Sequence, residues 1–261
     1  MKAVLLVLVS FVLGGCSTVG YYMDAINGHF EIIEKSRPIE TVISGNKSDE
    51  LVEKLENFQK ARKYATNTLL LPDNDSYKEY ADIGRPYAVW NVIAASEFSV
   101  EPKKWCFLFV GCISYRGYFN RQDAEKYAEH LKSQGYDVYV AGARAYSTLG
   151  WFDDPLLNTM MYQSEAARVG ILFHELAHQK IYIEDDSAFN EAFATTIEQE
   201  GVKRWFKDNN ETGKLTEYKK AIKSKTEFNF LLKKYRSKLE KVYSDKIDKQ
   251  QKLTEKKQLL N

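Results

Sequence analysis

Residues 171–178 read Ile-Leu-Phe-His-Glu-Leu-Ala-His and contain the pattern His-Glu-x-x-His. Its two histidines, His174 and His178, are four positions apart, so on an α-helix they share one face and can bind one metal ion. Glu175 stands beside the first histidine, where it can act as general base on water in a zinc site. Apolar residues at helical spacing predict that one side of this helix is buried: Val169, Leu172, Phe173, Leu176 and Ala177.

A third zinc ligand is expected elsewhere, because catalytic zinc usually has three protein ligands and one open position. We expect Glu191, which follows His178 by 13 residues on a second predicted helix. Glu198, two turns further along nearly the same face, is the rival, and Asp185 and Asp186 are weaker because they are expected in a loop. This second helix begins near residue 187, and its predicted inward-facing residues are Phe189, Ala192, Phe193, Thr196 and Ile197.

The predicted site suits the hydrolysis of an amide. Zinc lowers the pKa of water and polarises a carbonyl, while Glu175 would take the proton of the water and deliver it to the leaving amine. The resulting oxyanion needs a hydrogen-bond donor, for which Tyr146, in the loop before the motif helix, is the candidate and Tyr182 an alternative. Glu198 or Asn190 could accept a hydrogen bond from the second ring nitrogen of a ligand histidine.

The segment Trp-Phe-Asp-Asp-Pro at residues 151–155 has two open interpretations. It could form the wall of a substrate pocket, with the two carboxylates binding the ammonium group of a peptide. It could equally be a turn that packs two aromatic side chains into the core.

The N-terminus has the pattern of an export signal. Lys2 is followed by an apolar run at residues 3–13, too short to span a bilayer as a helix, and then by small residues. The sequence Leu13-Gly14-Gly15-Cys16 looks like a bacterial lipobox, which predicts removal of residues 1–15 and lipidation of Cys16; a plain secretory signal is the alternative. In a Gram-negative source, Ser17 rather than Asp after the cysteine favours the outer membrane.

The remaining cysteines, Cys106 and Cys112, form an even pair close together in the sequence. In an exported protein this pattern predicts a disulfide that closes a tight loop or hairpin. A metal site is the alternative, but it lacks neighbouring histidines or cysteines.

Composition and patterning set the domain organisation. The 261 residues are 44% hydrophobic, enough for a sizeable core, and a net charge of +1 gives no reason to expect nucleic acid as a partner.

Residues 18–70 are expected to form at least two helices, one of them capped by Ser48. Strands are predicted at residues 87–94, 105–110, 113–119 and 136–141, with a helix at 121–134 opened by Asn120 and Asp123. A strand, helix, strand unit indicates a sheet that is partly parallel or mixed. Residues 211–261 are rich in lysine and predict an amphipathic helix with a solvated face.

Five stretches together resemble the predicted-aminopeptidase family of proteobacterial lipoproteins, which carry zincin-type metal motifs. In this sequence the stretches are residues 71–74, 84–87, 146–155, 173–179 and 189–194. The resemblance implies zinc on His174 and His178, catalysis by Glu175, Glu191 as third ligand, and a place in the Gram-negative envelope.

We therefore expect an α+β, zincin-like fold in which a mixed β-sheet packs against the active-site helix, with helical N- and C-terminal regions. The expected divisions are a signal peptide (1–15), a membrane-proximal helical region (16–70), a metallopeptidase core (71–210) and a helical tail (211–261). The expected function is a zinc peptidase, an aminopeptidase by resemblance, that acts on peptides and is anchored by acyl chains to the periplasmic face of the envelope. The alternatives are a metalloendopeptidase and a non-catalytic lipoprotein that binds or assembles partners. The sequence leaves the oligomeric state open.

Overall fold

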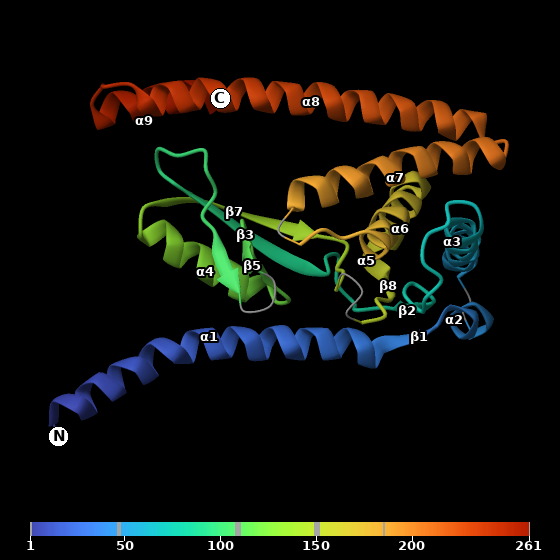
Figure 1. Ribbon diagram of the computed structural model, residues 1–261, viewed down its shortest axis with the longest axis horizontal. Helices are drawn as coiled ribbons and strands as arrows, with labels where there is room; N and C mark the ends of the chain where they lie inside the picture. Colours follow the sequence, from blue (N-terminus) through green and yellow to red (C-terminus); the bar gives the residue numbers. More distant parts are fainter. Residues whose placement is uncertain (1, 46–47, 108–110, 149–151, 185, 261) are drawn as a thin grey trace.

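The chain forms an α+β structure, as predicted, in which small sheets lie between helices on opposite sides of the molecule (Figure 1). The computed structural model describes residues 2–45, 48–107, 111–148, 152–184 and 186–260, with side chains from residue 19 onward. Among the helices whose side chains are described, none has the length and apolar character needed to cross a membrane.

The N-terminal third is helical, as expected. Helix α1 (Lys2–Lys35) runs along one side of the body, and Cys16 lies in its part without described side chains. Strand β1 (Ser36–Pro38) separates it from α2 (Ile39–Gly45) and α3 (Asp49–Asn67). The predicted cap is confirmed, because the Ser48 side chain accepts a hydrogen bond from the backbone N–H of Leu51.

The largest sheet has the strand order β6-β3-β7. Strand β3 (Val89–Ser96) is antiparallel both to β6 (Arg116–Tyr118) and to β7 (Tyr136–Ala143). The predicted crossover through α4 (Arg121–Ser133) is present, and it connects β6 to β7. The expected parallel pairing within this unit is wrong, because β3 lies between β6 and β7 and every pairing in this sheet is antiparallel.

Helix α4 covers this sheet through a narrow apolar face. Ala124, Ala128 and Leu131, one turn apart from each other, are buried against Val92 and Ala94 of β3. The Asn120 side chain caps the helix by accepting a hydrogen bond from the N–H of Gln122.

Strands β4 (Trp105–Phe107) and β5 (Gly111–Ile113) form an antiparallel hairpin in which Cys106 and Cys112 are direct partners. The predicted disulfide joins them, with a Cα–Cα distance of 3.9 Å. Residues 108–110, the end of the strand expected at 105–110, lie outside the described residues.

A parallel pairing occurs in the smaller sheet, whose order is β1-β2-β8. Strand β2 (Glu79–Ala81) is antiparallel to β1 and parallel to β8 (Leu156–Leu157), which leads directly into the short helix α5 (Asn158–Met161). Mixed pairing is therefore present, although not where the sequence placed it.

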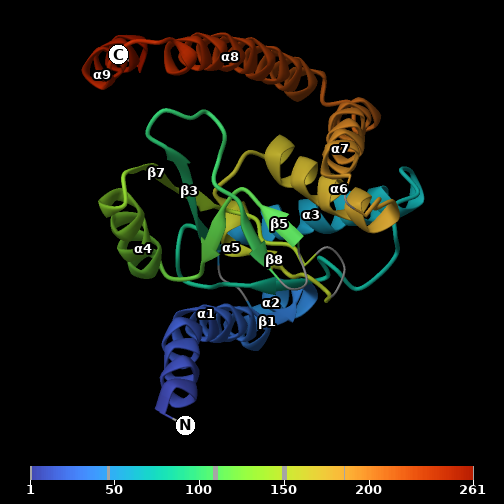
Figure 2. The same ribbon diagram turned by 60° about the vertical axis from the view of Figure 1, so that its left-hand side comes forward.

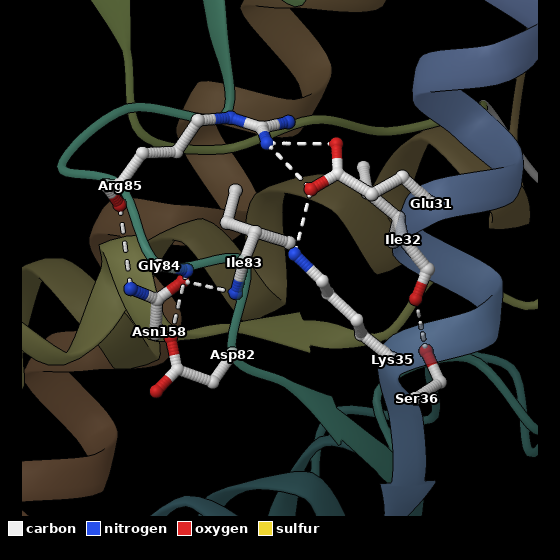
Figure 3. Close-up of polar contacts among 9 residues, drawn as sticks. All are labelled: Glu31, Ile32, Lys35, Ser36, Asp82, Ile83, Gly84, Arg85 and Asn158. Atoms are coloured by element: carbon white, nitrogen blue, oxygen red, sulfur yellow. Dashed lines mark hydrogen bonds and ion pairs between the residues drawn. The ribbon is translucent and has the colours of Figure 1, made fainter.

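Polar contacts attach the end of α1 to the loop that follows β2 (Figure 3). Glu31 accepts two hydrogen bonds from one guanidinium nitrogen of Arg85, at 2.8 and 3.0 Å, and a third from Lys35 at 2.7 Å. The Asn158 side chain accepts from the N–H of Ile83 at 3.1 Å and donates to the carbonyl of Arg85 at 3.3 Å. These contacts fix α1 against the strand pair that leads to the candidate site.

The main core lies between α3, α6 (Glu165–Lys180) and α7 (Ser187–Asp208). The predicted apolar face of α6 is confirmed, since all five of its residues are fully buried. The inward face expected for α7 is confirmed for Phe193 and Ile197, which pack against the core. It is wrong for Phe189, Ala192 and Thr196, which are exposed. The buried residues of α7 are Asn190, Ala194, Gly201, Val202, Trp205 and Phe206.

The C-terminal helices α8 (Thr212–Ser244) and α9 (Lys249–Leu260) lie on the side of the body opposite to α1 (Figures 1 and 2). They return to the loop after β3, where Phe98 meets Tyr243 with 5.7 Å between ring centroids. Lys256 donates to the carbonyl of Glu97 at 2.6 Å and pairs with Asp137.

Candidate metal centre

Two helices supply the residues of the predicted metal site, and their packing follows from the sequence. Ser164 caps the start of α6 by accepting a hydrogen bond from the N–H of Ala167 at 3.3 Å. The buried face of α6 then leaves His174 and His178 on the side that meets α7, whose first turns carry Glu191 and Glu198. Figure 2 shows α6 and α7 side by side.

Glycines permit the close approach of these two helices. A Cβ atom on Gly201 of α7 would lie 2.6 Å from Cδ2 of Phe173 on α6, which is inside van der Waals contact. A Cβ atom on Gly170 of α6 would lie 3.2 Å from Cγ of Glu198 on α7. The small residues therefore bring the carboxylates of α7 within reach of the histidines of α6.

The three predicted ligands lie together. The Nε2 atoms of His174 and His178 are 3.1 Å apart. Nε2 of His174 lies 3.5 Å from Oε2 of Glu191, and Nε2 of His178 lies 3.5 Å from Oε1 of the same carboxylate. Zinc bonds of 2.0–2.1 Å at tetrahedral angles would separate ligand atoms by about 3.3 Å. His174, His178 and Glu191 could therefore hold one metal ion with little movement, and two imidazoles with one carboxylate suit zinc.

Glu198 lies where one of its two predicted roles, the support of a ligand histidine, would place it. Its Oε2 lies 3.2 Å from Nδ1 of His174, so it can accept a hydrogen bond from the ring nitrogen that faces away from Glu191. Burial lowers the pKa of His174, but the hydrogen bond that it donates to Glu198 and the charges of nearby carboxylates outweigh this effect and leave the pKa raised. For His178, burial and the charge of His174 lower the pKa, and Nδ1 has no hydrogen-bond partner within the described part of the chain.

Asn190 does not support a histidine. Its side chain accepts from the N–H of Ile183 at 2.8 Å and donates to the carbonyl of the same residue at 2.7 Å. It thereby fixes the loop between α6 and α7, while Asp186 caps α7 by accepting from the N–H of Phe189 at 2.9 Å. Asp185 lies outside the described residues.

The candidate base Glu175 is half-buried and hydrogen-bonded to Ser147. Burial raises its pKa above the ordinary value, against the lowering effects of His174 and Ser147. The Ser147 hydroxyl also lies 3.1 Å from Oδ2 of the buried Asp154, and its single proton can be donated to one of the two carboxylates at a time. Asp154, on the loop before α6, thus lies beside the serine that contacts the candidate base.

Asp154 has a structural role in this loop. Its carboxylate accepts hydrogen bonds from the N–H and the hydroxyl of Thr148, both at 2.9 Å, in addition to that of Ser147. These hydrogen bonds agree with a turn in this part of residues 151–155. The expected packing of its aromatic side chains into the core is wrong for Phe152, which is 56% exposed, and Trp151 lies outside the described residues.

The tyrosines near the site differ from expectation in one respect. Tyr146 is half-buried, packs on Phe119 and has its hydroxyl 3.5 Å from Nδ1 of His29. Tyr182 is 55% exposed in the loop after α6. Tyr115, between β5 and β6, is a further tyrosine near the site that the sequence does not single out. It is 43% exposed, and its pKa is raised by partial burial and by the charges of Glu191 and Glu175. Nothing in the sequence around Tyr115 indicates this, since the two glutamates reach it through the tertiary fold.

Comparison with known proteins gives one match. The model of a family described as "Putative aminopeptidase" matches residues 20–261, which include the whole candidate metal centre. No curated protein and no solved structure gave a significant match.

Proposed function

The chain belongs to the family described as "Putative aminopeptidase", and from this premise we propose that it is a zinc-dependent peptidase with a zincin-type centre. The observation that carries the proposal is the grouping of His174, His178 and Glu191. The two histidine Nε2 atoms are 3.1 Å apart, and each lies 3.5 Å from a different oxygen of the Glu191 carboxylate. With one ligand atom from each of these residues, the fourth tetrahedral position of a zinc ion is free for water or substrate.

The protein side chains divide the proposed reaction between them. A zinc ion held by His174, His178 and Glu191 would acidify water and polarise the scissile carbonyl. Glu175 accepts the proton of the attacking water and passes it to the nitrogen of the leaving amine. Ser147 orients the Glu175 carboxylate, and burial keeps the pKa of Glu175 raised, which helps it to return the proton.

We propose Tyr115 as a second candidate donor to the developing oxyanion, beside Tyr146. The support for Tyr115 is that the charges of Glu191 and Glu175 both raise the pKa of its hydroxyl, as expected for a side chain near the site, although it is 43% exposed. The Tyr146 hydroxyl lies 3.5 Å from Nδ1 of His29. Replacing either tyrosine by Phe removes the hydroxyl and keeps the ring. Loss of an oxyanion donor lowers kcat by about 100-fold or more. We expect this loss for Tyr115→Phe, and a larger loss for Tyr146→Phe would reverse the assignment.

The test of the proposed function is Glu175→Gln, measured as peptide turnover and as bound zinc. We expect turnover to be abolished and zinc to be retained, because the amide cannot accept the proton and Glu175 is not a ligand. Glu200→Gln, on the exposed side of α7, is the control and should behave as the wild type. Full cellular function in the Glu175→Gln variant would instead support the non-catalytic binding or assembly protein.

The aminopeptidase and endopeptidase forms of the proposal differ in their need for a free amino terminus. Paired peptides with free and acetylated N-termini distinguish them. We expect cleavage of the free form, and equal cleavage of both would exclude an aminopeptidase.

We also propose that the protein is a lipoprotein of the Gram-negative envelope that faces the periplasm, most simply at the outer membrane. The support is the lipobox-like Leu13-Gly14-Gly15-Cys16 at the end of an apolar run. Cys16→Ser should move the protein from the membrane fraction to the soluble periplasmic fraction, and an unchanged distribution would contradict the acyl anchor.

A further inference from the structure

Helix α1 carries an apolar stripe that faces away from the body. The stripe consists of exposed residues at alternating spacings of four and three: Val19, Met23, Ile26, Phe30 and Ile33. Their exposed fractions are 62, 52, 47, 62 and 44%. Single exposed apolar residues are ordinary on a protein surface, but a continuous row over two heptads is not.

The opposite side of α1 is the one that packs on the body. Tyr21 stacks on Phe107 at 5.7 Å, and Gly28 is so close to Phe119 that a Cβ atom would lie 2.1 Å from its ring. Ile32 is fully buried, and Glu31 is held by Arg85. The body therefore fixes the rotation of α1 and leaves the stripe pointing outward, with no other described segment over it in either view (Figures 1 and 2).

The spacing indicates what would cover the stripe. An apolar row that repeats every 3.5 residues is the narrow seam of a coiled coil, whereas a helix that packs on a globular core has a wider apolar face with a period of 3.6. We propose that α1 is a dimerisation helix, whose stripe pairs in parallel with the same stripe of a second copy of this chain.

Charge favours a second copy over a lipid surface. Between Val19 and Lys35, the residues of α1 that carry a fixed charge are Asp24, Glu31, Glu34 and Lys35. Helices that lie on membranes carry Lys and Arg on their polar face to bind anionic lipid, so an acidic helix is poorly suited to that role. Among the residues that would flank the seam, only Glu34 carries a fixed charge, so two parallel copies meet little like-charge repulsion.

The geometry of the whole chain is compatible with this pairing. Because the stripe and the packed face lie on opposite sides of one helix, two copies can meet through α1 with their bodies outward. The seam described here covers two heptads, fewer than the three or four typical of a stable coiled coil, so we expect weak, concentration-dependent association.

The first test is sedimentation velocity over about a hundredfold range of concentration. A chain that starts at Ser17 is suitable, because the described contacts of α1 with the body begin at Tyr21. The wild type should shift from monomer to dimer, and Met23→Ser with Phe30→Ser should remain monomeric at an unchanged Tm. The matched control is Phe228→Ser with Leu232→Ser on α8, whose residues are 58 and 51% exposed, and it should dimerise as the wild type does.

A second test reports the orientation of the helices. In a parallel pair, residue 30 faces its own counterpart, so Phe30→Cys should form a disulfide-linked dimer under mild oxidation. The control Asp24→Cys, exposed but off the stripe, should not. A wild type that stays monomeric, an α8 control that loses association as well, or equal cross-linking at both positions would overturn the proposal. So would flotation of the wild type with lipid vesicles that is lost in the α1 variant without any self-association.

Discussion

Glu198 allows a test of how the ligand His174 is held in place, because Glu198 contacts His174 but is not itself a ligand in the proposed metal centre. Its Oε2 lies 3.2 Å from Nδ1 of His174, and the two side chains are 27 and 18% exposed. The hydrogen bond fixes the ring and its tautomer, so that Nε2 faces His178 and Glu191. Removing such a partner costs 10–100-fold in metal affinity, or about 1.4–2.7 kcal/mol.

We expect Glu198→Ala to weaken zinc binding by that factor. Glu198→Gln should have a smaller effect, since its carbonyl still accepts a hydrogen bond and its side chain still fills the contact with Gly170. The assay is competition for zinc with a chromophoric chelator, and Glu200→Gln, which loses only its exposed pair with Lys203, is the control. Wild-type affinity in Glu198→Ala, or an equal loss in the control, would refute the supporting role.

Two further predictions concern the packing that holds the site together. Gly201→Ala places a Cβ atom 2.6 Å from Phe173 and should lower the free energy of unfolding, measured in urea titrations, by about 1–3 kcal/mol. The control Gly213→Ala, with no neighbour within 4 Å, should not lower it. Equal effects of the two changes would contradict the close approach of α6 and α7. Glu165→Ala removes hydrogen bonds to Asn57 and Trp205 and should cost about 2 kcal/mol at pH 7. Burial opposes ionisation of Glu165, but these hydrogen bonds and Lys214 hold its pKa below the ordinary value. The stabilisation by Glu165 is therefore present above pH about 4.3 and is lost as the pH falls through the lowered pKa. Unfolding titrations at pH 7 and below pH 4 should show the difference between wild type and variant shrinking with acid, and a constant difference would contradict it.

Local signals in the sequence were sufficient for the elements around the site. The apolar face of α6, the caps at Ser48 and Asn120 and the cross-strand disulfide each depend on residues close together in the chain, and the structure contains all of them. The expected ligands also follow from local spacing, because two helices joined by a short loop must pack side by side.

The errors arise where distant segments decide the outcome. The sequence of β6, α4 and β7 predicts a parallel pair, but nothing in it reveals that β3, which comes earlier, lies between the two strands. For α7 only part of the expected face is buried. A criterion based on hydrophobicity places Phe189 inside along with Phe193 and Ile197, but Phe189 is exposed. The structure instead buries Asn190, which hydrogen-bonds to Ile183 in the preceding loop, and places Glu198 against His174 of α6. Tyr115 was missed for the same reason.

The most direct measurement is the metal content of the folded protein beside that of Glu191→Ala. We expect about one zinc per chain in the wild type, and loss or marked weakening of zinc binding in the variant, because only two of the three ligand residues remain. A properly folded wild type that takes up no metal when zinc is supplied would contradict the zinc centre and the peptidase mechanism built on it.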